Sequence, residues 1–524
     1  MTAATLVFAA CGGTADIESD YTLNLVPRVL GGQNPFQAQP SVKLVLMEQG
    51  SPAEVLYGGS ASDGSVTLPE MAQMPAGTQL GILLEDGSST GDVYDPGALV
   101  GYGQATLGQD LGIDGSVVDL EITVGQHANV GTMGAFDRDE SRLYAGIAVV
   151  PGGDVLLFGG ARSGSLGGFG GKAASAEIRR MTNTDSGAWS FADVATLPVV
   201  DEEPDWAAMA ATTVADERGT PLVLVTGGRP DSSQVTNSDN AASAFLFDPA
   251  TNLVVWQEDN ALYTPRSEHV QVAMHNGNVL VVGGWNDGTL FPATANFEIF
   301  DPVARQFTPG DDPLTVGTLG LGWADLGAEG ILLCGGSVPQ GSDASAVTAE
   351  CNRIDLQGNV FPAPALPQPV SHLAMAALPD GGVIAMGGVI DDHADNAEVP
   401  ATAQAWRWDG LNSWTVVFGM NEARAHHRAI PLANGEVMVV GGTQTGGTVF
   451  PRPSGAVACT ERFDPATNEF STSEGSCNDA GAGAFISLAS YPGEGAYVLS
   501  GLWYDGSETN GGEDYGHIAL GPDL

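Results

Sequence analysis

The sequence predicts an all-β protein built from repeated units. Short runs rich in Val, Leu and Ile are bounded by Gly, Pro, Asn and Asp, which is typical of strands and turns. The spacing of apolar residues that is typical of amphipathic helices is nearly absent. A strand that ends in two glycines recurs: residues 154–160 read DVLLFGG, residues 278–284 read NVLVVGG, and residues 436–442 read EVMVVGG.

The paired glycines set the repeat length. The first glycine of each pair stands at 159, 227, 283, 335, 387 and 441, and a degenerate copy ends at 501. Fixed periods of roughly 20–50 residues or more are typical of repeat architectures, in which each unit packs on its neighbours. Glycine weakens a strand by about 0.5–1 kcal/mol relative to alanine. We therefore expect the pairs to provide an unusual backbone angle and a close approach to the neighbouring unit.

The charge balance is strongly acidic. The chain of 524 residues has 18 Lys and Arg against 63 Asp and Glu, a net charge of −45. This disfavours nucleic acid and anionic lipid surfaces as partners. No apolar run reaches the ~18 residues needed for a membrane-spanning helix. We expect a soluble, monomeric fold with a solvated acidic surface, attached to a membrane only through a lipid anchor.

The N-terminus carries a candidate export and anchoring signal. Residues 1–10 are apolar and end in two alanines before Cys11. This resembles the lipobox of bacterial lipoproteins, and the resemblance implies cleavage before Cys11, lipidation of its thiol and, with Gly12 next, sorting to the outer membrane. Phe8 replaces the usual Leu and no basic region precedes it, so a chance apolar leader is the alternative. Residues 11–20 are expected to be the lipidated Cys and a tether.

Residues 21–127 lack the repeat and predict a small β-sandwich. About seven short runs alternate apolar and polar residues, such as SVKLVLMEQG and VVDLEITVG. The region resembles immunoglobulin-like or carboxypeptidase-regulatory-like modules, and it offers no chemistry.

Residues 128–524 resemble the kelch repeat. The best unit reads PRSEHVQVAMHNGNVLVVGGWNDG and then ANFEIFDPVARQFTP, with Arg266, His269, Glu298 and Phe307 at the matching positions. The sixth unit has the same pattern. The resemblance implies a β-propeller, in which four-stranded blades pack face to face around a channel.

The last unit predicts how the propeller closes. Strands are expected near 484–490, 496–501 and 517–521, and no fourth strand follows. Since unpaired edges are a liability, we predict seven blades, the last completed by residues 129–137.

The cysteines after Cys11 are even in number, which fits an oxidising, exported compartment. Cys334 ends the second strand of the fourth unit and Cys351 starts its third strand. Cys459 lies on the third strand of the sixth unit and Cys477 follows the fourth. We predict the disulfides Cys334–Cys351 and Cys459–Cys477.

Histidines recur in the repeats. His269, His372 and His427 stand 14 or 15 residues before a glycine pair. A repeated position is a structural position, so we expect structural hydrogen-bonding residues rather than metal ligands. We expect no catalytic residues, metal or other cofactor. A weak alternative is Ca²⁺ at residues 391–398, DDHADNAE, which lack the Gly and terminal Glu of an EF-hand.

One kelch-like family, the galactose oxidases, is enzymatic and uses copper held by two His and two Tyr, one Tyr cross-linked to a Cys. No propeller Tyr lies beside the candidate histidines, and the cysteines are better explained as pairs.

Binding is expected on one face of the propeller. The loops after each glycine pair and the loops between blades emerge on the same side, and long loops on a rigid scaffold are where binding usually occurs. The candidate face comprises Trp285, Asn286, Asp287, Phe291, Asp391, Asp392, Trp503 and Tyr504. Alternatively, the two tryptophans only cap the blade core.

The predicted function is non-catalytic recognition or scaffolding of a protein or glycan at the bacterial cell envelope. The alternative is a carbohydrate-active enzyme on the same scaffold, either a galactose-oxidase-like oxidoreductase or a sugar epimerase. Fold alone does not decide between them.

Overall fold

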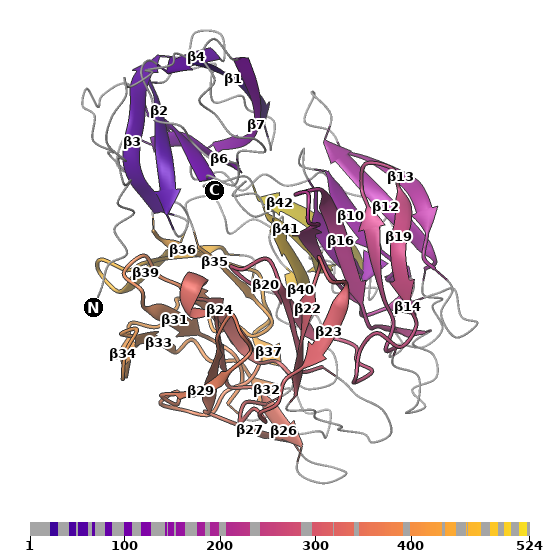
Figure 1. Cartoon of the computed structure of the whole chain (residues 1–524). Helices are drawn as coiled ribbons and strands as arrows, with labels where there is room; N and C mark the ends of the chain where they lie inside the picture. The colour runs from indigo at the N-terminus through magenta and orange to yellow at the C-terminus, as the bar shows by residue number, and fades with distance from the viewer. Residues whose placement is uncertain are drawn as a thin grey trace, which may run out of the picture.

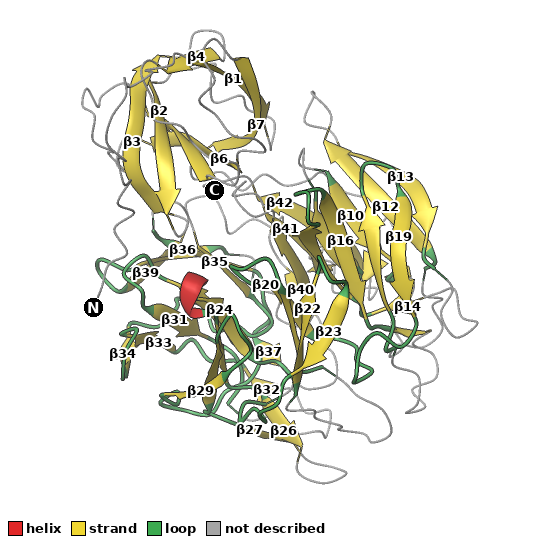
Figure 2. Cartoon of the chain, in the orientation of Figure 1, coloured by secondary structure: helices red, strands yellow, loops and turns green. Residues whose placement is uncertain are grey.

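The computed structural model describes most of the repeat region and the strands that precede it. The described residues are 21–29, 41–48, 51–60, 65–68, 79–85, 99–106, 117–126, 142–143, 145–150, 154–162, 175–183, 189–198, 206–230, 241–284, 296–317, 319–339, 345–390, 399–431, 435–446, 457, 459–472, 483–490, 497–504 and 513–520. Apart from one 3-10 turn, η3 (Gly327–Glu329), every regular element in these residues is a strand (Figure 2). The predicted all-β fold is confirmed.

The first seven strands form one sheet. They are β1 (Tyr21–Val29), β2 (Ser41–Glu48), β3 (Ser51–Ser60), β4 (Ser65–Leu68), β5 (Gln79–Glu85), β6 (Leu99–Thr106) and β7 (Val117–Gln126). Their order is β3-β2-β5-β6-β7-β1-β4, antiparallel except for the parallel pair β1–β7. Figure 1 shows this sheet strongly curled. Because β1 pairs with both β4 and β7, hydrogen bonds link all seven strands into one sheet. The β-sandwich predicted for residues 21–127 would instead have two separate sheets.

Both faces of the middle strands in this sheet are buried. Val42 and Leu44 on one face of β2 are 0–1% exposed, and Lys43 on the other face is 3% exposed. Lys43 Nζ lies 2.8 Å from a carboxylate oxygen of the fully buried Glu85. A buried charge needs such a partner, so the pair explains how a lysine is accommodated inside this sheet.

The repeats form a β-propeller. Six sheets, blades 1–6, have four described strands each, and a seventh has three. Blades 1 to 3 consist of β9 (Gly146–Val149), β10 (Val155–Phe158), β12 (Glu177–Asn183) and β13 (Trp189–Thr196); β15 (Ala210–Ala215), β16 (Pro221–Thr226), β18 (Ala244–Asp248) and β19 (Leu253–Glu258); β20 (Val270–Ala273), β21 (Val279–Val282), β22 (Phe297–Asp301) and β23 (Gln306–Pro309).

The remaining blades follow the same plan. Blades 4 to 7 consist of β24 (Gly322–Asp325), β25 (Ile331–Cys334), β28 (Cys351–Ile354) and β29 (Val360–Ala363); β30 (Ala374–Ala377), β31 (Val383–Met386), β33 (Ala405–Trp408) and β34 (Trp414–Val417); β35 (Arg428–Pro431), β36 (Val437–Val440), β38 (Glu461–Asp464) and β39 (Glu469–Thr472); β40 (Gly483–Ser490), β41 (Tyr497–Tyr504) and β42 (Glu513–Leu520).

The last sheet returns to the first. Strands β40 and β41 contact β9, so the last described sheet packs against the first, and Figure 1 shows β41 and β42 beside β10. The segment predicted to complete this sheet, residues 129–137, lies outside the described residues. The blade number and the closing strand therefore stay predictions.

Second strands form the centre of each blade. Every residue of β10, β21, β31 and β36 is buried. A continuous apolar run indicates a strand covered on both faces, here by the two neighbouring blades. One cluster shows this directly, since it joins Leu246 of blade 2 to Val279 of blade 3.

The glycine pairs connect consecutive blades. In all six pairs the first glycine has φ between 60° and 69° and the second between 86° and 105°, angles that side chains disfavour. The N–H of the second glycine donates to a carbonyl of the next blade: Gly228 to Arg266 and Gly388 to Arg424, both at 2.9 Å. A Cβ on Gly227 would overlap with that same Arg266 carbonyl. This confirms the expected role of the pairs.

Candidate functional site

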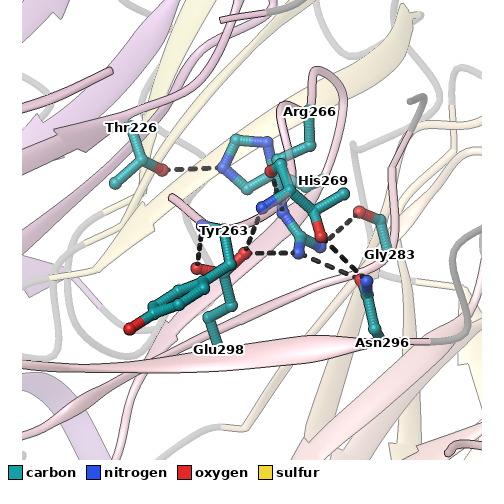
Figure 3. Close-up of polar contacts among 8 residues, drawn as sticks. Thr226, Tyr263, Arg266, His269, Gly283, Asn296 and Glu298 are labelled. Carbon is teal, nitrogen blue, oxygen red and sulfur yellow. Dashed lines mark hydrogen bonds and ion pairs between the residues drawn. The ribbon is translucent and has the colours of Figure 1, made fainter. Parts of the chain in front are cut away.

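A buried polar cluster lies between blades 2 and 3 (Figure 3). Arg266 is fully buried; its Nη1 donates to the carbonyl of Gly283 at 2.9 Å and its Nη2 to Glu298 at 2.9 Å. Glu298 also accepts the backbone N–H groups of Tyr263 and Thr264, at 2.8 and 3.1 Å. The carboxylate thereby fixes the loop that enters blade 3.

The same cluster recurs in blade 6. Arg424 donates to the carbonyl of Gly441 at 2.9 Å and to Glu461 at 2.6 Å, and both side chains are fully buried. Glu461 accepts the N–H groups of Asn421 and Glu422. Recurrence in two blades argues for a role in the scaffold.

Other blades replace this pair by uncharged residues. In blade 5 Val370 stands where Arg424 does in blade 6, since its carbonyl accepts from Gly336, the second glycine of the preceding pair, as the carbonyl of Arg424 accepts from Gly388. Trp406 takes the glutamate's position opposite β31. Both are buried in one apolar cluster. In blade 4 the amide oxygen of Asn352 binds the N–H of Thr315 at 2.7 Å. Because an apolar pair occupies the same positions in blade 5, we interpret the charged pairs as part of the scaffold.

His269 and His427 pack on the glycine pairs. His269 Nε2 lies 2.8 Å from the hydroxyl of Thr226. Burial, with a smaller contribution from Arg266, lowers the pKa of His269 to about 3. A Cβ on Gly387 would lie 2.5 Å from the ring of His427, as one on Gly227 would lie 2.8 Å from that of His269. These contacts support the structural interpretation of both residues.

His372 does not belong to this set, and its alignment with His269 and His427 was wrong by one residue. Its φ is 54°, like the 53° of His426 and the 52° of Glu268. Each of these three stands 15 residues before a glycine pair, whereas His269 and His427 stand 14 before it. One residue of shift turns a side chain to another face of the chain.

These left-handed residues form what we call the inner ring. Its described members are Ala208, Glu268, Gly320, His372 and His426, with φ between 52° and 61°. Each immediately precedes the first strand of a blade, and those first strands contact one another, as β15 contacts β20 and β30 contacts β35. In a propeller the innermost strands line the central channel, so the ring surrounds one mouth of that channel.

Backbone hydrogen bonds run from blade to blade along this ring. The N–H of Glu268 donates to Ala208 at 3.1 Å, that of His372 to Gly320 at 2.6 Å, and that of His426 to His372 at 3.2 Å. The backbone of the ring is therefore fixed without help from the side chains.

Most residues of the inner ring have side chains, although glycine would adopt the left-handed backbone angles at a lower free-energy cost. A non-glycine residue in the left-handed region costs on the order of 1–2 kcal/mol, and Gly320 shows that glycine fits the position. Strained residues persist at binding and active sites more often than elsewhere. Glu268, His372 and His426 are therefore candidate functional residues, which sequence reasoning missed except for the histidine recurrence.

The ring side chains meet polar neighbours. Glu268 accepts from Arg229 Nη2 at 2.7 Å, with both side chains about one fifth exposed. The rings of His372 and His426 are in contact, with centroids 4.2 Å apart. Burial, then His372 and Arg428, holds the pKa of His426 well below its usual range.

Loops after the glycine pairs meet the loops between blades, as predicted. β14 (Trp206–Ala207), between blades 1 and 2, pairs with β17 (Arg229–Pro230), which follows Gly228. Ser371 pairs with Val389 in the same way. The inner ring therefore lies at the predicted binding end of the propeller.

Most residues of the predicted face lie outside the described residues. This applies to Trp285, Asn286, Asp287, Phe291, Asp391 and Asp392. Trp503 and Tyr504 were expected in a loop, and the structure places them in strand β41, opposite Asp514 and Glu513. With Ser-Gly in place of the glycine pair, the chain does not turn at Gly501 and the strand continues.

The predicted pairing of Cys334 with Cys351 is confirmed, and this disulfide crosses from β25 to β28. Cys459 is also disulfide-bonded. Cys477, its predicted partner, and Cys11, the predicted lipidation site, lie outside the described residues.

Within the described residues no group of three or more His, Cys, Asp or Glu could hold a metal ion. His372 and His426 are a pair of histidines with rings in contact, their centroids 4.2 Å apart. No helix of the described chain is long and apolar enough to cross a bilayer.

The sequence was compared with protein families and with curated proteins. No family model matches the chain. The tRNA wybutosine-synthesizing protein 4 of Saccharomyces cerevisiae is 29% identical over 150 residues, which are 28% of this chain and 20% of that protein.

Two solved structures are similar. A fungal alcohol oxidase of the AA5 family, in complex with copper, superposes with a TM-score of 0.51 at 17% identity, covering 75% of this chain and 77% of the oxidase. The structure of YjhT matches with a TM-score of 0.44 at 15% identity, over 65% of this chain and 99% of YjhT. At 17% identity the likeness to the oxidase establishes the propeller fold alone.

The copper of the similar oxidase raises the question whether a galactose-oxidase-type centre fits here. Such a centre needs a tyrosine cross-linked to a cysteine, but the described cysteines, Cys334, Cys351 and Cys459, are all in disulfides. Tyr263 is 65% exposed on the surface. The described residues do not fit that centre.

Proposed function

We propose that this chain is a kelch-repeat lipoprotein of the cell envelope whose propeller binds a glycan, without catalysis, at the mouth surrounded by the inner ring. The observation that carries the proposal is that Glu268, His372 and His426 stand at left-handed positions around one mouth of the channel, although such angles are costly for residues with side chains.

The chemistry of the ring suits a polyhydroxylated ligand. Carboxylate, guanidinium and imidazole groups from Glu268, Arg229 and the two histidines offer both donors and acceptors within one mouth. Trp285, expected on the adjoining loop, would supply an apolar surface for a sugar face. The buried clusters at Arg266 and Arg424 take no part, because apolar residues replace them in blade 5.

A glycan array probed with the labelled full chain tests this function. Glu268→Gly should weaken binding at least tenfold and leave the melting temperature unchanged or higher, because glycine relieves the left-handed strain. Trp285→Ala should weaken binding with little effect on stability. His275→Ala, an exposed hairpin position, is the matched control. Equal binding by all variants would place the ligand elsewhere.

The alternative is a carbohydrate-active enzyme on the same scaffold, which shares its fold with the fungal alcohol oxidase, but the described cysteines are in disulfides and do not fit a galactose-oxidase copper centre. Release of peroxide from sugars by the chain would nevertheless overturn the proposal of binding without catalysis.

The lipoprotein assignment has its own test. Mass spectrometry of the protein expressed in a bacterial envelope should find acyl chains on the N-terminal cysteine, and Cys11→Ser should release the chain from the membrane fraction.

A further inference from the structure

His372 and His426 meet because the backbone brings them together. They occupy successive positions of the inner ring, and the N–H of His426 donates to the carbonyl of His372 at 3.2 Å. Their rings lie with centroids 4.2 Å apart and planes tilted by 43°. The hydroxyl of Ser371 lies 3.1 Å from Nδ1 of His372, which orients that ring in the way that partners of metal-bound histidines do.

One ring nitrogen of this pair is buried without a hydrogen-bond partner among the described residues. Nε2 of His426 is buried and has no hydrogen-bond partner among the described residues. Leaving a buried polar atom without a partner costs about 1–3 kcal/mol. Native structures rarely accept this without a water, an ion or a function at the atom. Both histidines also carry left-handed strain that glycine would remove.

We propose that His372 and His426 bind one divalent transition-metal ion, such as Zn²⁺, through their imidazole nitrogens. Neutral imidazole is the typical ligand of Zn²⁺, Cu²⁺ and Ni²⁺, at ~2.0–2.1 Å for zinc. Because the two rings are in contact at the same end of adjacent blades, rotation of the side chains would let one nitrogen of each ring bind the same ion while the backbone stays in place. Water or a bound ligand fills the remaining positions.

The charges around the pair select the kind of ion. Arg428 lies near His426 and repels cations, whereas the net charge of −45 attracts them over longer range. Among the described residues no carboxylate joins the pair in a metal-binding group, so the two imidazoles offer little to Ca²⁺ or Mg²⁺, which prefer oxygen. The site is thus selective for ions that bind nitrogen strongly. It differs in composition from the copper centre excluded above and does not depend on the proposed glycan ligand.

The proposal is tested by isothermal titration calorimetry, in which Zn²⁺ is added to the full chain after all metal has been removed. Electron paramagnetic resonance of the chain loaded with Cu²⁺ reports whether nitrogen atoms bind the ion. We expect one ion per chain, at least a tenfold weaker affinity in His372→Gly and in His426→Gly, and no binding at this site in the double variant. Glycine suits the left-handed angles, so these variants should fold, and His275→Ala should bind as the parent does.

Three results would overturn the proposal. They are no uptake by the parent chain, uptake that survives the double variant unchanged, and equal uptake of Ca²⁺ or Mg²⁺. Glycan binding measured in parallel separates this outcome from the proposed function, because Glu268→Gly should affect the glycan and leave Zn²⁺ uptake intact.

Discussion

Replacing Gly227 by alanine should destabilise the propeller far more than the same change at Gly219. Both glycines have left-handed angles, with φ of 61° and 75°. An added Cβ at Gly219 meets nothing within 4 Å, whereas at Gly227 it overlaps with the carbonyl of Arg266 and lies 2.8 Å from the ring of His269. The two variants thus share the conformational penalty and differ only in the clash between blades.

The expected magnitudes follow from this difference. The conformational penalty is about 1–2 kcal/mol at both sites. At Gly227 the clash adds a further ~1–3 kcal/mol or more, the range typical of overpacking, because the obstructing atom is backbone that is held by the Gly228 hydrogen bond. We expect a total of about 2–5 kcal/mol for Gly227→Ala, against about 1–2 kcal/mol for Gly219→Ala.

Scanning calorimetry and urea unfolding followed by tryptophan fluorescence measure this effect. One kcal/mol shifts a melting temperature by about 2–4 °C in domains of 150–250 residues, and less in a larger cooperative unit. The ratio between the two variants is therefore the decisive quantity. Equal shifts in the melting temperature for Gly219→Ala and Gly227→Ala would refute the idea that the glycine pairs exist for contact between blades.

Three further predictions follow. Glu461→Gln should destabilise the fold by about 3–5 kcal/mol, as expected when one partner of a buried ion pair is neutralised. Combining Arg424→Val with Glu461→Trp copies the apolar pair of blade 5, and unfolding curves of that double variant should show no such loss. The pKa of His269 is about 3 in the folded protein and ~6.5 in the unfolded chain. The contribution of neutral His269 to the free energy of unfolding is therefore complete above pH ~6.5 and is lost as the pH falls toward 3. The free energy of unfolding should differ by roughly 2 kcal/mol between pH 7 and pH 5, and His269→Leu should remove that difference. Non-reducing peptide mapping should recover the Cys459–Cys477 disulfide, and free thiol at either cysteine would contradict it.

The sequence was sufficient for the scaffold because each blade repeats the same physical requirement. Second strands must be apolar on both faces, and glycine must stand where two blades approach closely. The same reasoning located the Cys334–Cys351 disulfide, because positions just before the turn of β25 and at the start of β28 are cross-strand neighbours.

The candidate site was less accessible to such reasoning. Placing His372 beside His426 depends on a spacing of 15 rather than 14 residues, and that single residue separates a side chain at the channel mouth from one between blades. Glu268 gave no signal of its own, because a left-handed glutamate looks like any other glutamate in a sequence. Trp503 was misplaced because the end of β41 depends on a turn that only a full glycine pair enforces.

The hydrogen bonds along the inner ring have a consequence for how such a protein can change. Main-chain hydrogen bonds hold neighbouring ring residues together, as between His426 and His372. Several ring positions therefore accept different side chains, although a Cβ at Gly320 would overlap with His372. Ala, Glu, Gly and His already stand there in one chain. Single substitutions around the channel mouth can therefore give new binding specificities while the blades stay the same. A designer can replace these side chains one at a time.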